Sequence, residues 1–302
     1  MDLMEKISRF TLGAAQLGLP YGISGRPLVD SPEDILRAAR EAGIDTIDTA
    51  KAYGNSEEMI GRYLKKNAGW SPDIITKIKI EGASAAELVR EVEMKLDDSL
   101  EKLGRKSIYG LMLHNYGALA RHKRSLVDAM AQLKAARKVA KIGISVYGAD
   151  ELKISLGYDE FEIFQGPVNL FDRRITSSGS LKEIVRRKKS FFARSVFLQG
   201  LFFMDDEALA GKVPEARTYI GKLRGLSEKS GMSVAELAFS YTGSIEGITS
   251  LVLGVKSRKQ LSDLIALLKT KPIARDLAGQ IEKIFSDVPQ YVYDPRRWPN
   301  AV

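Results

Sequence analysis

The sequence predicts an α/β protein in which eight parallel strands close into a (β/α)8 barrel, the TIM barrel fold. Eight short apolar runs alternate with segments of helical periodicity through most of the 302 residues, and this alternation is typical of parallel βα units. No linker or low-complexity tract separates the units, so we expect residues 1–302 to form a single domain. The alternative, an open doubly wound sheet, is disfavoured because the turn after the first strand lacks the Gly-x-Gly-x-x-Gly pattern.

The first half of the chain contains four predicted strands and the helices with the clearest end signals. The strands are the apolar runs at 10–15, 46–50, 73–79 and 108–114, and helices are expected at 31–43, 57–66 and 84–104. Ser31 is the predicted N-cap of the first of these helices, with Pro32 beside it and Gly43 at the end. Ser84 and Glu87 have the spacing of a capping box at the start of the longest helix.

The second half repeats the alternation. Strands are expected at 141–147, 161–168, 191–197 and 250–255, and helices at 125–138, 149–156, 177–189, 233–242 and 257–268. Residues 205–230 look like an extra excursion between the seventh and eighth strands. The two halves together supply the eight units that a barrel requires.

Composition narrows the function classes. Hydrophobic residues make up 44% and charged residues 28%, no apolar run is long enough to span a membrane, and the N-terminus lacks the apolar region of a secretory signal, so we expect a cytoplasmic protein. The absence of cysteine excludes disulfides and thiolate zinc sites, and two histidines make a multi-histidine metal centre unexpected. The net charge is +8, but no aromatic and basic RNA signature accompanies it, so no nucleic-acid partner is expected.

Polar residues gather where the predicted strands end. Asp48 ends the second strand, Tyr53 follows it, Lys77 lies near the end of the third, and His114 ends the fourth. The active site of such a barrel lies at the C-terminal ends of its strands. Each residue alone has an ordinary structural explanation, but charges inside apolar strands are costly unless they are paired. We therefore expect a Lys77–Asp48 pair beside Tyr53 and His114.

These four residue types suit proton transfer to a carbonyl. A tyrosine is normally protonated near neutral pH, and a neighbouring ammonium should lower its pKa. Tyr53 would then donate a proton to a carbonyl oxygen or take one from an alcohol, with Lys77 tuning it, Asp48 holding Lys77 and His114 orienting the carbonyl. None of these groups supplies a hydride, so a redox cofactor is required.

The chain resembles the aldo-keto reductase superfamily over about residues 9–268. The resemblance rests on "DTAKAYGNSE", on Lys77 in "ITKIK" and on His114 in "LMLHN", with weaker matches in "TLGAAQLG", "GISVYG", "FQGPVN" and "LGVKSRKQLSDL". It implies a barrel enzyme that reduces aldehydes or ketones to alcohols with NADPH and without a metal. It also implies that Asp48, Tyr53, Lys77 and His114 are the catalytic residues.

The resemblance implies a set of cofactor-binding residues. These are Gly13, Ser145, Gln165, Arg194, Ser195, Gly200, Lys256, Ser257, Arg258 and Gln260. Ser145 and Gln165 match residues that hold the nicotinamide carboxamide, and the segment 256–258 matches the site of the adenosine 2′-phosphate, which favours NADP over NAD. Several positions depart from the family, among them Ala14 in place of Thr and Leu264 in place of Asn. Val146 replaces the usual Asn, and Arg194 replaces an aromatic ring, which suggests an anionic substrate or a phosphate as its partner.

The resemblance also indicates where a small carbonyl or alcohol substrate would bind. Gln16, Leu17 and Tyr21 in the first loop are candidate contacts, and a C-terminal tail of about residues 285–302 is expected to cover the pocket. Trp298 either lines that pocket or pins the tail. Two other functions stay open: a nicotinamide-binding regulatory subunit without useful turnover, and a non-redox isomerase or lyase that uses Tyr53 and Lys77 as acid and base.

Overall fold

The computed structural model describes residues 9–23, 25, 27–82 and 84–299. Its eight parallel strands pair in chain order, and β1 closes on β8. They are β1 (Phe10–Gly13), β2 (Thr46–Asp48), β3 (Asp73–Ile78), β4 (Ile108–Leu113), β5 (Val139–Ser145), β6 (Phe161–Pro167), β7 (Ser190–Arg194) and β8 (Ser250–Gly254). The predicted (β/α)8 barrel is confirmed, and the closure between β1 and β8 rules out the open sheet.

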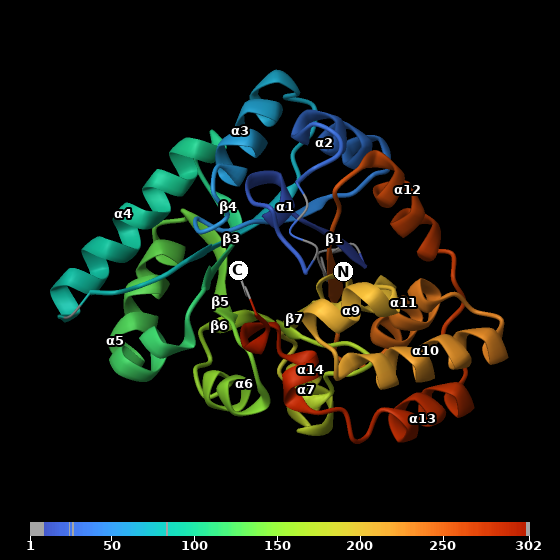
Figure 1. Ribbon diagram of the computed structural model, residues 1–302. Helices are drawn as coiled ribbons and strands as arrows, with labels where there is room; N and C mark the ends of the chain where they lie inside the picture. The colour runs from blue at the N-terminus through green and yellow to red at the C-terminus, as the bar shows by residue number, and fades with distance from the viewer. Residues whose placement is uncertain (1–8, 24, 26, 83, 300–302) are drawn as a thin grey trace, which may run out of the picture.

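Helices surround the strands on all sides (Figure 1). They are α1 (Ala15–Gly18), α2 (Pro32–Glu41), α3 (Ser56–Lys66), α4 (Ala85–Leu103), α5 (Tyr116–Ala135), α6 (Ala149–Ser155), α7 (Arg174–Ser177), α8 (Ser180–Arg186), α9 (Asp206–Lys212), α10 (Ala216–Ser230), α11 (Val234–Ser244), α12 (Arg258–Leu267), α13 (Arg275–Ile284) and α14 (Gln290–Tyr293), with short 3-10 turns η1 (Leu198–Phe203) and η2 (Pro295–Arg297). The excursion at 205–230 consists of α9 and α10, and the helix expected at 177–189 is divided into α7 and α8.

The helix ends follow the capping signals in the sequence. The Ser31 side chain accepts a hydrogen bond from the backbone N–H of Asp34, and Ser84 and Glu87 form the predicted capping box. α4 ends at Gly104, whose φ of 62° is a left-handed conformation that glycine adopts without steric cost. These caps satisfy backbone groups that would otherwise lack partners.

The interior of the barrel is filled rather than open. Side chains from β3, β4, β6 and β7 pack there as one cluster, made of Ile75, Tyr109, Met112, Ile163 and Phe192. A larger cluster joins the outer faces of the strands to the surrounding helices. Because apolar packing occupies the barrel axis, the polar residues that the strands carry toward their C-terminal ends lie together at one rim.

The C-terminal segment packs on the side of the molecule that carries α9, α10 and α11. In Figure 1 the red helix α14 lies next to α7, and the guanidinium of Arg174 stacks on the Tyr293 ring at 4.9 Å. Trp298 is buried in the same apolar cluster as α9–α11, and its indole N–H donates to the carbonyl of Tyr291 at 3.0 Å. Trp298 therefore contacts the tail and the helices beside it, and its role toward a substrate stays a prediction.

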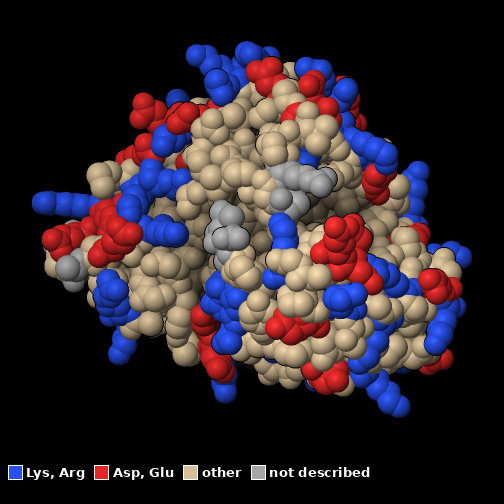
Figure 2. Space-filling view, in the orientation of Figure 1, with Lys and Arg blue, Asp and Glu red and all other residues tan. Residues whose placement is uncertain are grey.

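Surface charge, helix length and metal-ligating side chains can be compared among the described residues. Figure 2 shows Lys and Arg side chains interspersed with Asp and Glu over the face in view. Among the described residues, no helix is both long enough and apolar enough to cross a membrane. Within the same part of the chain, no three His, Asp or Glu side chains form a group that could hold a metal ion.

Candidate active site at the C-terminal end of the barrel

A buried ion pair lies at the centre of the rim. Lys77 Nζ on β3 is 2.7 Å from Asp48 Oδ2 on β2 and donates a second hydrogen bond to the Thr49 carbonyl at 2.9 Å. The other oxygen of Asp48 accepts a hydrogen bond from Gln165 Nε2 on β6 at 2.7 Å. Lys77 is completely buried and Asp48 is 3% exposed. Each charge is thus satisfied by partners from neighbouring or facing strands.

Tyr53 and His114 lie against this pair. Lys77 Nζ is 5.0 Å from the centroid of the Tyr53 ring. The Tyr53 and His114 rings meet edge to face, with centroids 5.7 Å apart and planes at 87°. The four residues that the sequence singled out therefore lie together, although they come from three strand ends and one loop.

The backbone around Tyr53 is held by contacts with α1. Gly54 has a φ of 56°, and a Cβ on it would lie 2.4 Å from the Gly18 carbonyl oxygen. A Cβ on Gly18 would lie 1.9 Å from the Tyr53 carbonyl oxygen. Ser56 adds a hydrogen bond to the Ala14 carbonyl at 2.9 Å. Two glycines in mutual contact therefore set the position from which Tyr53 reaches the rim.

The pKa shifts in the ligand-free protein show which protonation states are available. Burial raises the pKa of Tyr53, and the Asp48 charge adds to this, while Arg194 lowers it. The net direction is opposite to the lowering expected from Lys77, because desolvation outweighs the nearby cations. Burial also lowers the pKa of Lys77, and Asp48 opposes that change. The phenol therefore begins protonated, as a proton donor must.

His114 is a neutral imidazole. Burial first, and then the charge of Lys77, lower its pKa to about 3. Its Nδ1 atom is buried and has no hydrogen-bond partner among the described residues. An unpartnered buried nitrogen is uncommon in folded proteins and often marks a functional site. A neutral imidazole at this position can hydrogen-bond to a ligand without bringing a second positive charge next to Lys77.

The residues proposed to hold the nicotinamide carboxamide are adjacent. Ser145 at the end of β5 is paired in register with Gln165 on β6. The Ser145 hydroxyl forms no hydrogen bond with a described residue, whereas the Gln165 amide already supports Asp48. Gly13 lies in register with both Asp48 and Gly254, so it faces the same rim. A free hydroxyl beside an amide fits a carboxamide ligand.

The loop after β7 has a strained backbone. Ser195, Leu198 and Gln199 have positive φ values of 60°, 47° and 55°, and Gly200 has 95°. Left-handed non-glycine residues cost about 1–3 kcal/mol each and cluster at ligand sites. Gln199 Nε2 donates to the hydroxyl of Tyr21 at 3.1 Å, which joins this loop to the first loop.

The start of α12 is already capped in the ligand-free protein. Ser257 accepts a hydrogen bond from the Gln260 N–H at 3.1 Å, and the Gln260 side chain accepts one from the Lys256 N–H at 2.8 Å. The N–H of Arg258 donates to Asp30 Oδ2 at 2.7 Å. Asp30 is a residue that the sequence reasoning missed, because nothing in its local sequence links it to a helix more than two hundred residues away.

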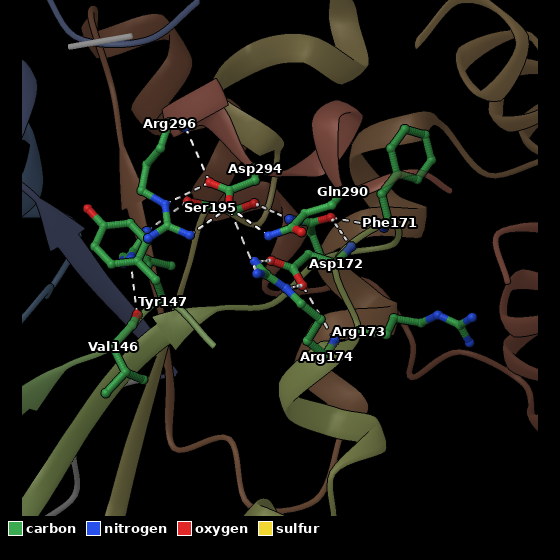
Figure 3. Close-up of polar contacts among 12 residues, drawn as sticks. Val146, Tyr147, Phe171, Asp172, Arg173, Arg174, Ser195, Gln290, Asp294 and Arg296 are labelled. Carbon is green, nitrogen blue, oxygen red and sulfur yellow. Dashed lines mark hydrogen bonds and ion pairs between the residues drawn. The ribbon is translucent and has the colours of Figure 1, made fainter. Parts of the chain in front are cut away.

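Two arginines stack on Tyr147, which follows the end of β5. The guanidinium carbon of Arg194 is 4.4 Å and that of Arg296 is 4.2 Å from the centroid of the ring. Figure 3 shows Tyr147 beside Arg296, which is held in turn by Asp294. The sequence reasoning missed Tyr147 and Arg296, although Tyr147 directly follows Ser145 and Val146 at the end of β5.

The candidate substrate residues divide into two groups. Gln16 packs against the end of β8, since a Cβ on Gly254 would lie 2.1 Å from its Oε1 atom. Burial, with a contribution from Tyr53, raises the pKa of Tyr21 to about 12, and the Tyr21 hydroxyl accepts a hydrogen bond from Gln199. By contrast, Leu17 is 4% exposed within the main core, and Trp298 lies in the cluster that holds the tail.

Known proteins resemble this chain over most of its length. The model of the Aldo/keto reductase family matches residues 9–285. The chain is 24% identical over 326 residues to L-glyceraldehyde 3-phosphate reductase of Escherichia coli (strain K12), covering 93% of this chain and 91% of that protein.

Two solved structures share the fold. An aldo-keto reductase from Bacillus halodurans in its holo form has a TM-score of 0.75 at 20% identity, covering 96% of this chain and 95% of the other. The glycerol dehydrogenase of Gluconobacter oxydans has a TM-score of 0.74 at 19% identity, covering 93% and 92%.

The family to which these proteins belong carries out oxidation and reduction between carbonyls and alcohols, generally with a nicotinamide cofactor. Its model spans nearly the whole barrel of this chain. The chain therefore belongs to the aldo/keto reductase family.

Proposed function

We propose that the protein is an NADP-dependent reductase that converts an aldehyde or ketone reversibly to an alcohol. The observation that carries this proposal is the buried Lys77–Asp48 pair, 2.7 Å between charged atoms, beneath a protonated tyrosine and a neutral histidine. Such a set of side chains can deliver a proton from the tyrosine to a substrate and stabilise the negative charge that remains on the phenolate.

Tyr53 is the general acid. Its hydroxyl donates a proton to the carbonyl oxygen, and the Lys77 ammonium stabilises the phenolate that remains. His114, neutral because of burial, hydrogen-bonds to the same oxygen and orients it. Asp48 keeps Lys77 charged and in place. A bound nicotinamide cofactor supplies the hydride.

We propose that the cofactor lies across the strand ends from β5 to β8. Ser145 and Gln165 would hold the carboxamide, with Gly13 beneath it. The strained loop that includes Ser195 and Gly200 would line the dinucleotide. Lys256, Ser257, Arg258 and Gln260 would receive the adenosine 2′-phosphate, since basic side chains there join a helix start that attracts anions. The carboxylate of Asp30, which accepts a hydrogen bond from the Arg258 N–H, lies at the same helix start.

Tyr53→Phe tests the proposed reaction. The variant should lose carbonyl reduction by about 10²–10⁴-fold, because a general acid typically contributes that much. Its affinity for NADPH, followed by the quenching of protein fluorescence, should stay near the wild-type value. Tyr158→Phe is the matched control, because Tyr158 lies just before β6 at the opposite end of the barrel.

The wild-type protein separates the three candidate functions. Saturable binding of NADPH followed by reduction of compounds in an aldehyde panel supports the proposal. Binding without turnover supports a regulatory subunit, and no binding at millimolar cofactor supports a non-redox enzyme. Near-wild-type turnover in Tyr53→Phe would remove the phenol from the mechanism.

A further inference from the structure

Arg194 is a cation at the reactive rim without a carboxylate partner. It ends β7 and is half-buried. Its Nη2 donates to the Val146 carbonyl at 3.1 Å, Nη1 has a 3.5 Å contact with Ser195 Oγ, and the guanidinium stacks on Tyr147. Among the described residues, no carboxylate forms an ion pair with it. Within the described part of the chain, two of its N–H donors have partners, so the remaining donors of the guanidinium can bind a ligand.

Unlike Arg194, the neighbouring Arg174 and Arg296 each form an ion pair with a carboxylate. Arg174 pairs with Asp172 at 2.7 Å, and Arg296 pairs with Asp294 at 2.6 Å, as Figure 3 shows. The charge of Glu151 on α6 also contributes to the raised pKa of Arg296. A half-buried cation without an opposite charge is costly, and the cost falls when an anion binds beside it.

Arg194 is close enough to the reactive residues to act on their charges. It is among the causes of the pKa shifts of Tyr53, Lys77, His114 and Tyr21. Its guanidinium holds the carbonyl of Val146, which directly follows Ser145 in the proposed carboxamide site. An anion bound to Arg194 would thus lie next to the position of the reacting carbonyl.

We propose, on the basis of the proposed function, that the substrate is a short aldehyde or ketone that carries a carboxylate or phosphate, and that Arg194 binds this anion. A guanidinium is suited to this task because its planar fork matches both anions with parallel hydrogen bonds. Tyr147 orients the fork by stacking on it. The cofactor's own diphosphate is the other possible anion, and the experiment distinguishes the two.

The test compares matched substrates in Arg194→Met and Arg194→Lys. One pair is glyceraldehyde 3-phosphate and glyceraldehyde, and the other is 4-oxobutanoate and butanal. In wild type, kcat/KM should favour the charged member of a pair. Arg194→Met should reduce the ratio of kcat/KM between the charged and the neutral member by about tenfold to hundredfold, the value of a lost hydrogen bond to a charged group. Arg194→Lys should retain part of the preference, since the charge remains.

Coenzyme affinity and a control variant complete the test. The NADPH dissociation constant of Arg194→Met should stay within about threefold of wild type, whereas weaker NADPH binding with equal losses on both substrates would assign Arg194 to the coenzyme and overturn the proposal. Equal losses with unchanged NADPH binding would also overturn it. Arg186→Met is the control, because this exposed arginine lies beyond the other end of β7.

Failure of the inference is distinguishable from failure of the proposed function. Equal kcat/KM for charged and neutral members in wild type would overturn the anion site and leave carbonyl reduction standing. If the wild-type protein reduces no carbonyl, calorimetric titration with 4-hydroxybutanoate shows whether Arg194 still binds an anion. Binding that Arg194→Met abolishes would support the anion site without the reductase, and absence of binding would overturn both.

Discussion

Lys77 and Asp48 form a buried structural pair and also have proposed catalytic roles. Lys77 is completely buried, and its ammonium is stabilised by the Asp48 carboxylate and the Thr49 carbonyl. Removing one partner of such a pair leaves an uncompensated charge and costs about 3–5 kcal/mol. A loss of activity in a Lys77 or Asp48 variant is therefore ambiguous, and the phenol and the imidazole, which are neutral, are the better residues for mechanistic tests.

The pH dependence of the two reaction directions should differ. Carbonyl reduction needs protonated Tyr53, whose pKa burial raises, and neutral His114, whose pKa burial lowers to about 3. Its kcat/KM should therefore be flat from about pH 5 to about pH 9, while alcohol oxidation, which needs the phenolate, should rise with pH over this range. Rate profiles in both directions at saturating coenzyme test this. An inflection of reduction near 6.5 that disappears in His114→Gln would show that the imidazole titrates there.

At the scale of elements, short loops rather than long helices place the reactive groups. α1 and the loop after β2 meet through Gly18 and Gly54, and neither position has room for a side chain. The loop after β7 is joined to the first loop by the Gln199–Tyr21 hydrogen bond. Functional loops on a rigid barrel are the usual arrangement of this fold.

Gly18→Ala should impair catalysis more than folding. The new Cβ would lie 1.9 Å from the Tyr53 carbonyl oxygen and 2.8 Å from the Ser56 nitrogen. Both are backbone atoms, so the loop that carries Tyr53 must shift. A displacement of about 1 Å can cost about 10²-fold in rate. Steady-state kinetics and melting temperature measure the two effects separately.

Gly221→Ala is the control for this prediction. Gly221 lies within α10, and nothing stands within 4 Å of the Cβ it would gain. Alanine is a better helix former than glycine, so this variant should be as stable as wild type or more so. Wild-type kcat in Gly18→Ala would show that the contact does not position Tyr53.

Asp30 should set the coenzyme preference at the start of α12. Its carboxylate accepts a hydrogen bond from the Arg258 N–H and lies 3.8 Å from Arg258 Nε. Asp30→Asn removes a negative charge from the proposed 2′-phosphate position, so NADPH should bind more tightly relative to NADH by about tenfold. Arg258→Ala should weaken NADPH more than NADH. Fluorescence titrations with both coenzymes provide the measurement, and equal changes for the two would refute a 2′-phosphate site here.

At the scale of the whole molecule, the described residues pack into three apolar clusters. One fills the barrel, one joins the strands to the outer helices, and one holds α9–α11, α13 and the tail. The second and third share the partly buried side chains of Phe197 and Ile245 at their boundary. We propose that residues 1–302 form one cooperative domain, because shared side chains couple the two clusters.

The two tryptophans can test this cooperativity. Trp70 packs against the cluster around the strands, and Trp298 lies in the cluster that holds the tail. Trp298→Phe leaves Trp70 as the fluorescent probe, and Trp70→Phe leaves Trp298. In each variant the thermal transition followed by fluorescence should coincide with the transition followed by far-ultraviolet circular dichroism. A tail that melts several degrees before the helices would indicate a separate unit.

The sequence by itself determined the architecture and which four polar side chains lie together at the rim. Buried strands and amphipathic helices have different periodicities, so their alternation is readable without contacts, and all eight strands were found where expected. The strand ends of a parallel barrel share one rim, so Asp48, Lys77 and His114 could be brought together from topology alone, with Tyr53 one loop away.

The tertiary structure alone decided how the surroundings act on that group. Some contacts depend on side chains far apart in the sequence, where no local pattern signals them. These are the stacking of two arginines on Tyr147, the contact of Asp30 with the start of α12 and the burial of Leu17. The sequence also could not predict the direction of the Tyr53 pKa shift, because this direction is a balance between desolvation and charges at particular distances. Periodicity is a local property of the chain, whereas burial and electrostatics are properties of the assembled rim.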